Sequence, residues 1–308
     1  MASTPPPRDK WRHGVPPSSP TNFRVEGPAP GDLPPLPPPP LWHYTTFDAL
    51  EGITRTGNLW ASKIQFLNDE QEFRHAWDVI IEAVRRRLGA TCSEGDGRTM
   101  RAILACARDV SKCVVCLSES RDQLSQWRGY GHGAPAVAIA FDRELLADAA
   151  ASLDHGWKLE RCLYSQAEKH AAVAPIADAI VREWPGQEVH DEARFNAVQR
   201  AVVKVWNEYM HIAPVLKHDG FREEAEVRLV SMPFPNDGSI WRFRRRDNLA
   251  VPYVEFPLAK TGVRNMAIQG VIVGPHPHQE SLMSAVQHLL SVRIKPPYWS
   301  TTSSIPYR

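Results

Sequence analysis

Residues 41–57 read LWHYTTFDALEGITRTG and decide how the fold begins. The short apolar run Leu41–Tyr44 predicts a strand. Thr45 or Thr46 can then cap a helix through its hydroxyl, because apolar side chains recur at helical spacing at positions 47, 50 and 53. Gly57 favours the left-handed conformation at which helices commonly stop. A strand followed directly by a helix indicates a mixed architecture rather than a helical bundle or a β-sandwich.

The remaining sequence repeats this alternation of short apolar runs and helical patterns. Strands are predicted at Cys113–Leu117, Ala136–Phe141, Leu159–Tyr164, Glu224–Val230, Ile268–Val273 and Val292–Ile294, with a hairpin over 241–256. Helices are predicted from Asn68-Asp69 to Leu88 and over 99–110, 167–183, 192–210 and 279–290. The helix over 192–210 is expected to present one apolar side made of Phe195, Val198, Val202, Trp206 and Met210. We therefore expect an α+β fold with a mixed, largely antiparallel sheet core, flanking helices and a helical insertion at about 165–212.

The composition changes abruptly near residue 40. Of the 27 prolines, 14 precede Leu41. A segment so rich in proline cannot form a core and favours a solvated, partly polyproline-II conformation. We predict a disordered proline-rich tail over residues 1–40 and a single α+β domain over 41–308, with a ligand for a proline-binding domain as the alternative interpretation of the tail.

The overall composition is that of an ordinary globular protein. With 308 residues and 43% hydrophobic content the chain can bury a substantial core, and a net charge of +1 gives no global reason to expect nucleic acid or acidic membranes as partners. Apolar runs of the membrane-spanning or signal type are missing from the sequence, so we expect a cytoplasmic protein without membrane contact. The pair Cys113 and Cys116 has zinc-like spacing but no second pair, so we predict reduced thiols and no metal site.

Six motifs resemble those of the bacterial family called domain of unknown function 2971. They are LWHYTT at 41–46, FLND at 66–69, CLSE at 116–119, QWRGY at 126–130, EAEVR at 224–228 and SIPYR at 304–308. Together they extend over nearly everything after residue 40. The family name implies no activity.

The EAEVR motif is a candidate site in its own right. On a strand, Glu224, Glu226 and Arg228 would share one face, with alternate residues about 7 Å apart. Two carboxylates and a guanidinium would then line one surface. The alternative is a solvated or salt-bridged strand face.

The order of strand, short helix, glycine and the pair Leu59-Trp60 also resembles the entry to the ADP-ribosyltransferase fold. This resemblance implies an ADP-ribosyltransferase-like fold and an enzyme that uses NAD as its substrate. It further implies that His43 holds the NAD ribose, that Tyr130 or Trp127 packs on nicotinamide, and that Glu226 contacts the nicotinamide ribose.

These assignments agree with the chemistry of the reaction. Cleaving the bond between nicotinamide and ribose passes through an oxocarbenium-like state, which a carboxylate at Glu226 would stabilise. Glu224 would orient the acceptor or act as general base. The remaining ligand contacts are assigned to Tyr44, Thr45 and Ser118 as hydrogen-bonding groups and to Arg228 as a partner of a diphosphate oxygen.

Each assignment has a structural alternative. His43 would be a satisfied strand histidine, Trp127 and Tyr130 would pack a helix onto the core, and Ser118 would cap a turn. Arg228 would neutralise a glutamate on its own strand.

Other features leave the acceptor and the function class open. A cluster of arginines interleaved with Trp241 and Phe243 would contact a nucleic acid, although a solvated hairpin is the default interpretation; its members are Arg242, Arg244, Arg245 and Arg246. The acceptor is therefore an unknown protein or nucleic acid. One alternative function is a noncatalytic sensing or binding module of a bacterial stress or phage-defence system. Another is a nuclease-like RNA-processing enzyme that uses His43 and Glu226 as base and acid.

Overall fold

The structure, a computed structural model, describes residues 38–67, 71–106, 110–131, 134–186, 191–235, 237–246, 248–258 and 267–307. The chain divides into Met1–Pro37 and Pro38–Arg308, and everything that follows concerns the second unit. The predicted proline-rich tail up to residue 37 and the predicted helix start at Asn68-Asp69 lie outside the described residues.

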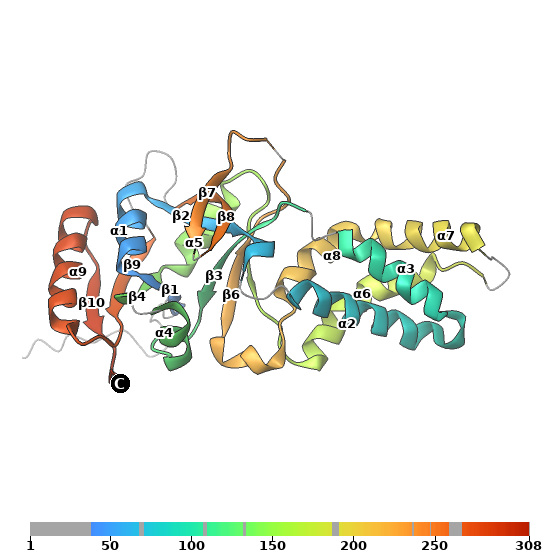
Figure 1. Cartoon of the computed structure of the whole chain (residues 1–308), viewed down its shortest axis with the longest axis horizontal. Helices are drawn as coiled ribbons and strands as arrows, with labels where there is room; N and C mark the ends of the chain where they lie inside the picture. The colour runs from blue at the N-terminus through green and yellow to red at the C-terminus, as the bar shows by residue number, and fades with distance from the viewer. Residues whose placement is uncertain are drawn as a thin grey trace, which may run out of the picture. The chain divides into compact units, whose positions relative to one another are not determined.

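Ten strands in the described part of the chain form one sheet (Figure 1), with the order β10-β9-β4-β1-β3-β2-β8-β7. Strand β6 also pairs with β3, and β5 pairs with β6. They are β1 (Leu41–Thr46), β2 (Asn58–Lys63), β3 (Cys113–Ser118), β4 (Ala136–Phe141), β5 (Lys158–Arg161), β6 (Glu226–Val230), β7 (Arg242–Arg246), β8 (Leu249–Pro257), β9 (Ile268–Val273) and β10 (Trp299–Thr302). The pairing of β9 with β10 is parallel, and the other pairings between these strands are antiparallel. The α+β class with a mixed, mostly antiparallel sheet is confirmed.

Strand β3 is the branch point of the sheet. Along one edge it pairs with β6 from Val114 to Ser118. On the other edge, β1 pairs with it opposite Ser118, whereas β2 pairs with it opposite Cys113 and Val114. Because β1 and β2 meet β3 at opposite ends, the middle of β3 has no strand partner on that edge among the described residues.

Helices cover both faces of the sheet around β1, β4 and β9. On one face, α1 (Phe47–Thr56), α5 (Arg143–Ala151) and α9 (Gln279–Arg293) pack on side chains such as Val137 and Ile139. On the other face, α4 (Leu124–Gly131) packs through Trp127 on Ala136 and Ala138. One strand contacts helices on both faces because its successive side chains point to opposite sides of the sheet.

Five helices form a second core: α2 (Gln71–Leu88), α3 (Glu94–Ala105), α6 (Gln166–Arg182), α7 (Asp191–Lys204) and α8 (Trp206–Ile212). This core includes Val114 of β3 and Val230 of β6, so the helices pack against the sheet at that point (Figure 1). The last three of these helices lie between β5 and β6 in the chain, which is where the sequence predicts inserted helices.

The opening prediction holds in detail. Thr46 is the N-cap of α1, and its hydroxyl oxygen accepts a hydrogen bond from the Ala49 amide at 3.3 Å. Gly57 ends the helix with φ of 72°, the left-handed region that costs glycine nothing. The strands predicted over 113–117, 136–141 and 268–273 and the hairpin over 241–256 are also confirmed.

Some predicted boundaries in the helical region are wrong. The helix predicted over 99–110 begins earlier, at Glu94, because Ser93 and Asp96 form a reciprocal capping box. The helix predicted over 192–210 is interrupted at Val205 and becomes α7 and α8. Its N-terminal Phe195 is 47% exposed and does not belong to the buried side.

Three strand predictions also differ from the structure. Val292 belongs to α9 and is 62% exposed, so 292–294 is not a strand, and the parallel partner of β9 is β10. Strand β6 begins only at Glu226. Glu224 ends a 3-10 helix over Asp219–Glu224, and Ala225 adopts φ of 42°, so Glu224 does not lie on a strand face with Glu226. The predicted strand Leu159–Tyr164 is shortened to β5.

Candidate active site

A cleft of about 1230 Å³ lies where β1 and β2 diverge from each other along β3. Its walls come from β1, α1, β2, β3, α4, the segment 217–228 and β7. Ordinary ligand pockets have volumes of roughly 300–1,000 Å³. The cleft therefore has room for an extended ligand.

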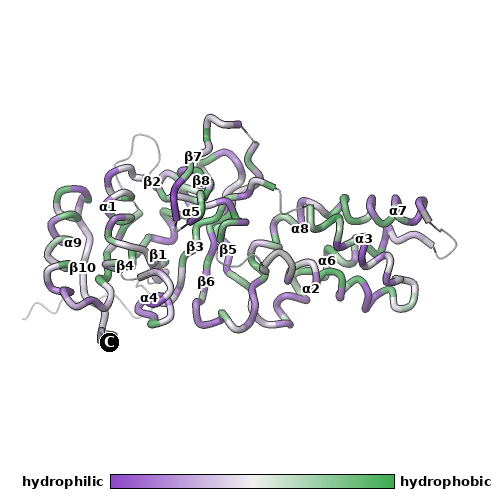
Figure 2. Tube along the Cα trace, in the orientation of Figure 1, coloured by the Kyte–Doolittle hydropathy of each residue, from purple (hydrophilic) through white to green (hydrophobic). Residues whose placement is uncertain are grey.

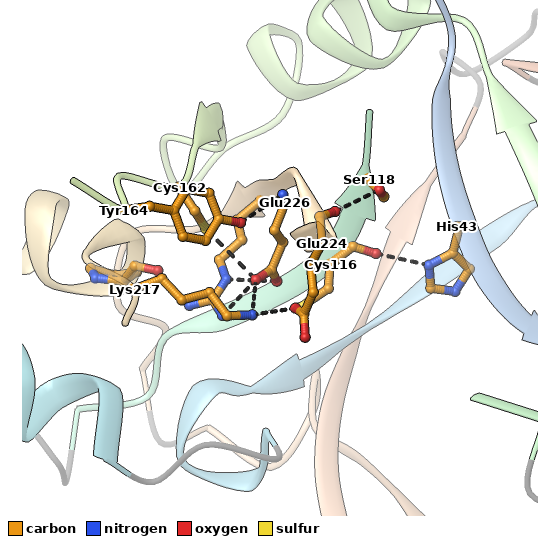
Figure 3. A network of polar contacts seen from close by, with 10 residues as sticks. His43, Cys116, Ser118, Cys162, Tyr164, Lys217, Glu224 and Glu226 are labelled. Carbon is orange, nitrogen blue, oxygen red and sulfur yellow. Dashed lines mark hydrogen bonds and ion pairs between the residues drawn. The ribbon is translucent and has the colours of Figure 1, made fainter. Parts of the chain in front are cut away.

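Glu226 is the centre of an ionic network whose charged residues line the cleft (Figure 3). Its carboxylate accepts hydrogen bonds from Arg228 Nε at 2.9 Å and from Lys217 Nζ at 2.5 Å. Cys162 Sγ lies 3.7 Å from the same carboxylate and donates to it, while the Tyr164 hydroxyl accepts from the Glu226 amide at 2.8 Å. Glu226, Arg228 and Lys217 are all buried, so the network is shielded from solvent.

The charges in this network decide the protonation state of Glu226. Burial alone would raise the pKa of the carboxyl, but the charges and hydrogen bonds of Arg228 and Lys217 outweigh it and lower the pKa to about 2. The carboxylates of Glu226 and Glu224 raise the pKa of the Lys217 ammonium, although burial alone would lower it. At neutral pH the network therefore holds charged groups of both signs.

Glu224 reaches the network from outside the strand. Lys217 Nζ donates to Glu224 Oε2 at 2.6 Å and thereby bridges both glutamates. The Glu224 side chain is 27% exposed, against 5% for Glu226. The structure thus brings the two predicted carboxylates together, through Lys217 rather than through strand alternation.

His43, on β1, lies beside the middle of β3, where β3 has no strand partner on that edge among the described residues. Its Nδ1 is 3.0 Å from the carbonyl oxygen of Cys116, in the middle of β3 (Figure 3). Desolvation by burial, together with the nearby charge of Arg244, lowers the pKa of the imidazole although the Cys116 carbonyl opposes this. A neutral imidazole that donates from Nδ1 to a carbonyl leaves Nε2 as a hydrogen-bond acceptor.

The other predicted ligand residues divide into two groups. Thr45 and Tyr130 line the cleft. Desolvation, and secondarily Cys116, Glu226 and Glu224, raise the pKa of the Tyr130 phenol, which remains protonated at neutral pH.

Three other predicted ligand residues use their polar groups in hydrogen bonds within the protein. Tyr44 lines the cleft wall but directs its hydroxyl to the Ser120 carbonyl at 2.8 Å. Its ring meets the edge of Trp127 at 4.8 Å between centroids, and Trp127 Nε1 donates to Asp122 at 2.7 Å. The Ser118 hydroxyl donates to the Glu224 carbonyl at 2.6 Å and accepts from the Ser120 amide. These bonds use the polar groups of Tyr44, Trp127 and Ser118 within the protein.

Arg228 is likewise occupied. Besides Glu226, it donates from Nη1 to the Pro214 carbonyl at 2.5 Å. Its side chain is 3% exposed. Arg228 also lines the cleft, so these bonds compete with its predicted contact with a diphosphate.

The arginines of β7 divide between the cleft and the solvent. Arg244, Arg245 and Arg246 line the cleft, whereas Arg242 does not and is exposed. Figure 2 shows β7 as a hydrophilic strand.

Sequence reasoning missed three residues of the site. Lys217 lies between a 3-10 helix and the acidic motif and carries no motif of its own. Trp60 was noted only as part of a dipeptide, yet its side chain lines the cleft and is 41% exposed. Ser125 lines the cleft with a buried hydroxyl that has no hydrogen-bond partner among the described residues.

Comparison with known families supports the first resemblance. Residues 126–229 match the model of a family described as Protein of unknown function (DUF2971). The family resemblance is confirmed. The DUF2971 segment runs from α4 to β6 and so contains Tyr130, Lys217, Glu224, Glu226 and Arg228. No curated protein shows significant similarity to the chain.

The described residues lack two kinds of feature. They contain no group of three or more His, Cys, Asp or Glu side chains arranged to hold a metal ion. Among the helices they form, none is long and apolar enough to cross a membrane.

Proposed function

We propose that the cleft binds NAD and that the protein is an ADP-ribosyltransferase-like enzyme, which transfers ADP-ribose to a protein or nucleic-acid acceptor. One observation carries the proposal: Glu224, Glu226 and His43, from separate elements of the fold, line one large cleft. Carboxylates and a neutral imidazole are the groups that cleavage of a glycosidic bond uses.

The geometry supports different roles for the two glutamates. Both oxygens of Glu226 bind cations, so this residue holds Lys217 and Arg228 in place and adds negative charge near the reacting sugar. Glu224 is more exposed and is bound at one oxygen by Lys217. It is therefore the carboxylate placed to approach a ribose or to accept a proton from the acceptor.

His43 fits the task of holding ribose hydroxyls. With its Nδ1 bound to the Cys116 carbonyl, it offers Nε2 as an acceptor to a hydroxyl donor. Because its pKa is lowered, the ring stays neutral at physiological pH and adds no positive charge beside a developing oxocarbenium ion.

The test is release of nicotinamide from NAD labelled in its adenylate half, in the presence of protein and nucleic-acid extracts. Glu224→Gln preserves the shape and a hydrogen-bond acceptor for Lys217, and we expect release to fall by about 100-fold or more. Glu82→Gln changes an exposed carboxylate of α2 that does not line the cleft, and it should retain full activity.

The label decides between outcomes. Label on a macromolecule identifies a transferase and its acceptor class, while release without labelling indicates hydrolysis of NAD. A folded wild-type protein that binds no NAD and releases no nicotinamide contradicts the proposal.

A noncatalytic binding module is the second candidate function. The observation that favours it is the ionic network itself, because Glu226, Lys217 and Arg228 satisfy one another without a ligand. Such a module would bind ADP-ribose or NAD in the cleft. Glu224→Gln would then change the dissociation constant by no more than about twofold, because substitutions of accessible polar side chains usually have small effects.

A further inference from the structure

Of the three β7 arginines that line the cleft, Arg244 and Arg246 share one face of the strand. Arg244 and Arg246 are two residues apart on one strand, so their side chains leave the same face of it. Arg244 Nη2 donates to the Ser62 hydroxyl at 2.8 Å, and Arg246 Nη2 donates to the Phe66 carbonyl at 2.7 Å. Each guanidinium is thus fixed by one bond, and the rest of its donors remain for other partners.

Neither arginine has a carboxylate partner among the described residues. The other partly or fully buried guanidiniums behave differently, because Arg194 pairs with Asp96 at 2.7 Å and Arg228 pairs with Glu226 at 2.9 Å. Arg244 Nε is buried with no hydrogen-bond partner in the described part of the chain. Buried donors and charges without partners are costly, so a site of this kind gains stability when an anion binds.

The charges of Arg244 and Arg246 act on each other and on His43. Desolvation, and then the charge of Arg246, lower the pKa of Arg244. The charge of Arg244 in turn lowers the pKa of His43. A pair of like charges beside a neutral histidine leaves this part of the cleft positive.

An aromatic surface adjoins the arginines. The Arg244 guanidinium lies 5.7 Å from the centre of the Trp60 ring, and Tyr253 supports the same ring at 4.8 Å between centroids. Trp60 lines the cleft and is partly exposed. An anion at the arginines would therefore have an aromatic plane beside it, on which a base can stack.

We propose that Arg244 and Arg246 form a phosphate subsite that binds the phosphate groups of a nucleotide. The nucleotide then lies with its phosphates at β7 and its reacting sugar toward His43 and Glu224. This inference deepens the proposed function and rests on it for the placement of the sugar. The phosphate role thereby passes from Arg228, which is bound to Glu226, to the arginines that lack an acidic partner.

The test measures binding of ADP, pyrophosphate and adenosine to the full chain by isothermal titration calorimetry. Wild type should bind ADP at least about tenfold more tightly than adenosine, and it should bind pyrophosphate. Arg244→Gln and Arg246→Gln should each weaken ADP binding about 10- to 100-fold while leaving adenosine binding unchanged. Arg242→Gln is the matched control, since Arg242 is on the same strand but outside the cleft, and it should bind ADP like wild type.

Stability measurements separate binding from folding. The midpoint of thermal unfolding of Arg244→Gln should be no lower than that of wild type, because the substitution removes one of two neighbouring positive charges. Arg244→Lys restores the charge and should recover part of the ADP affinity that Arg244→Gln loses. Equal affinity of wild type for ADP and adenosine overturns the phosphate subsite, as does an equal loss of ADP affinity in Arg242→Gln.

The two proposals fail in different ways. If ADP binds through Arg244 but no nicotinamide is released, the proposed function fails and the phosphate subsite stands. If Arg244→Gln releases nicotinamide with the KM of wild type, the subsite fails and the proposed function stands.

Discussion

Replacing Glu226 by glutamine should remove a large share of the stability of the protein at neutral pH. The substitution leaves the buried charges of Lys217 and Arg228 without their shared carboxylate. In the folded state the pKa of Glu226 is about 2, against 4.5 ordinarily, and this difference corresponds to about 3 kcal/mol at pH 7. Breaking a buried ion pair by removing one partner typically costs about 3–5 kcal/mol, which agrees in magnitude.

The sign of the pH dependence follows from the lowered pKa. The stabilisation is fully present above the unfolded-state pKa of 4.5 and is lost as the pH falls toward the folded-state pKa of about 2. The difference in unfolding free energy between wild type and Glu226→Gln should therefore fall by roughly half between pH 7 and pH 3.

Urea denaturation at pH 7, 5, 4 and 3, followed by tryptophan fluorescence, measures this difference. Glu82→Gln is the control, because its carboxylate is exposed and its ion pair with Arg86 should contribute less than about 1 kcal/mol at every pH. A Glu226→Gln variant as stable as wild type at pH 7, or a difference that stays constant down to pH 3, would refute the reasoning.

Three further predictions concern single positions. Gly57→Ala should lower the free energy of unfolding by about 1 kcal/mol because φ is 72° there, whereas Gly52→Ala in the same helix, with no atom within 4 Å of the added Cβ, should raise it by up to about 1 kcal/mol; urea denaturation of both variants checks the opposite signs. Trp127→Phe should cost about 1–3 kcal/mol through the lost bond to Asp122 but leave ADP affinity unchanged, and an equal loss of affinity would place Trp127 in the binding site after all. The His43 ring should titrate below 6.5 in an NMR pH series and carry its proton on Nδ1 above that pH; its contribution to stability is present above 6.5 and decreases as the pH falls below it, and titration above 6.5 would contradict the buried neutral state.

Local signals made much of the fold predictable. The cap at Thr46, the apolar spacing of α1 and the stop at Gly57 act within a few residues of one another, so the sequence displays them directly. Strands β3 and β4 are continuous apolar runs because both of their faces are buried. The apolar side chains of α2 recur at helical spacing, so the sequence shows this helix directly as well.

The features that the sequence did not predict depend on contacts between residues far apart in the chain. Strand β10 has only four residues, and no local pattern specifies its parallel pairing with β9 across the intervening helix α9. The left-handed Ala225 removes Glu224 from the strand although the sequence alternates as a strand would. In the site, Lys217 becomes important only because folding brings it between two glutamates, a consequence of long-range packing that its neighbours in sequence do not reveal.

The most direct test of the account is a crystal structure of the protein with ADP-ribose. The account predicts ADP-ribose in the cleft, with phosphate oxygens within hydrogen-bond distance of Arg244 or Arg246 and the terminal ribose beside His43 and Glu224. Binding outside the cleft, or binding with the adenosine end beside Glu224 and no phosphate at the β7 arginines, would contradict it.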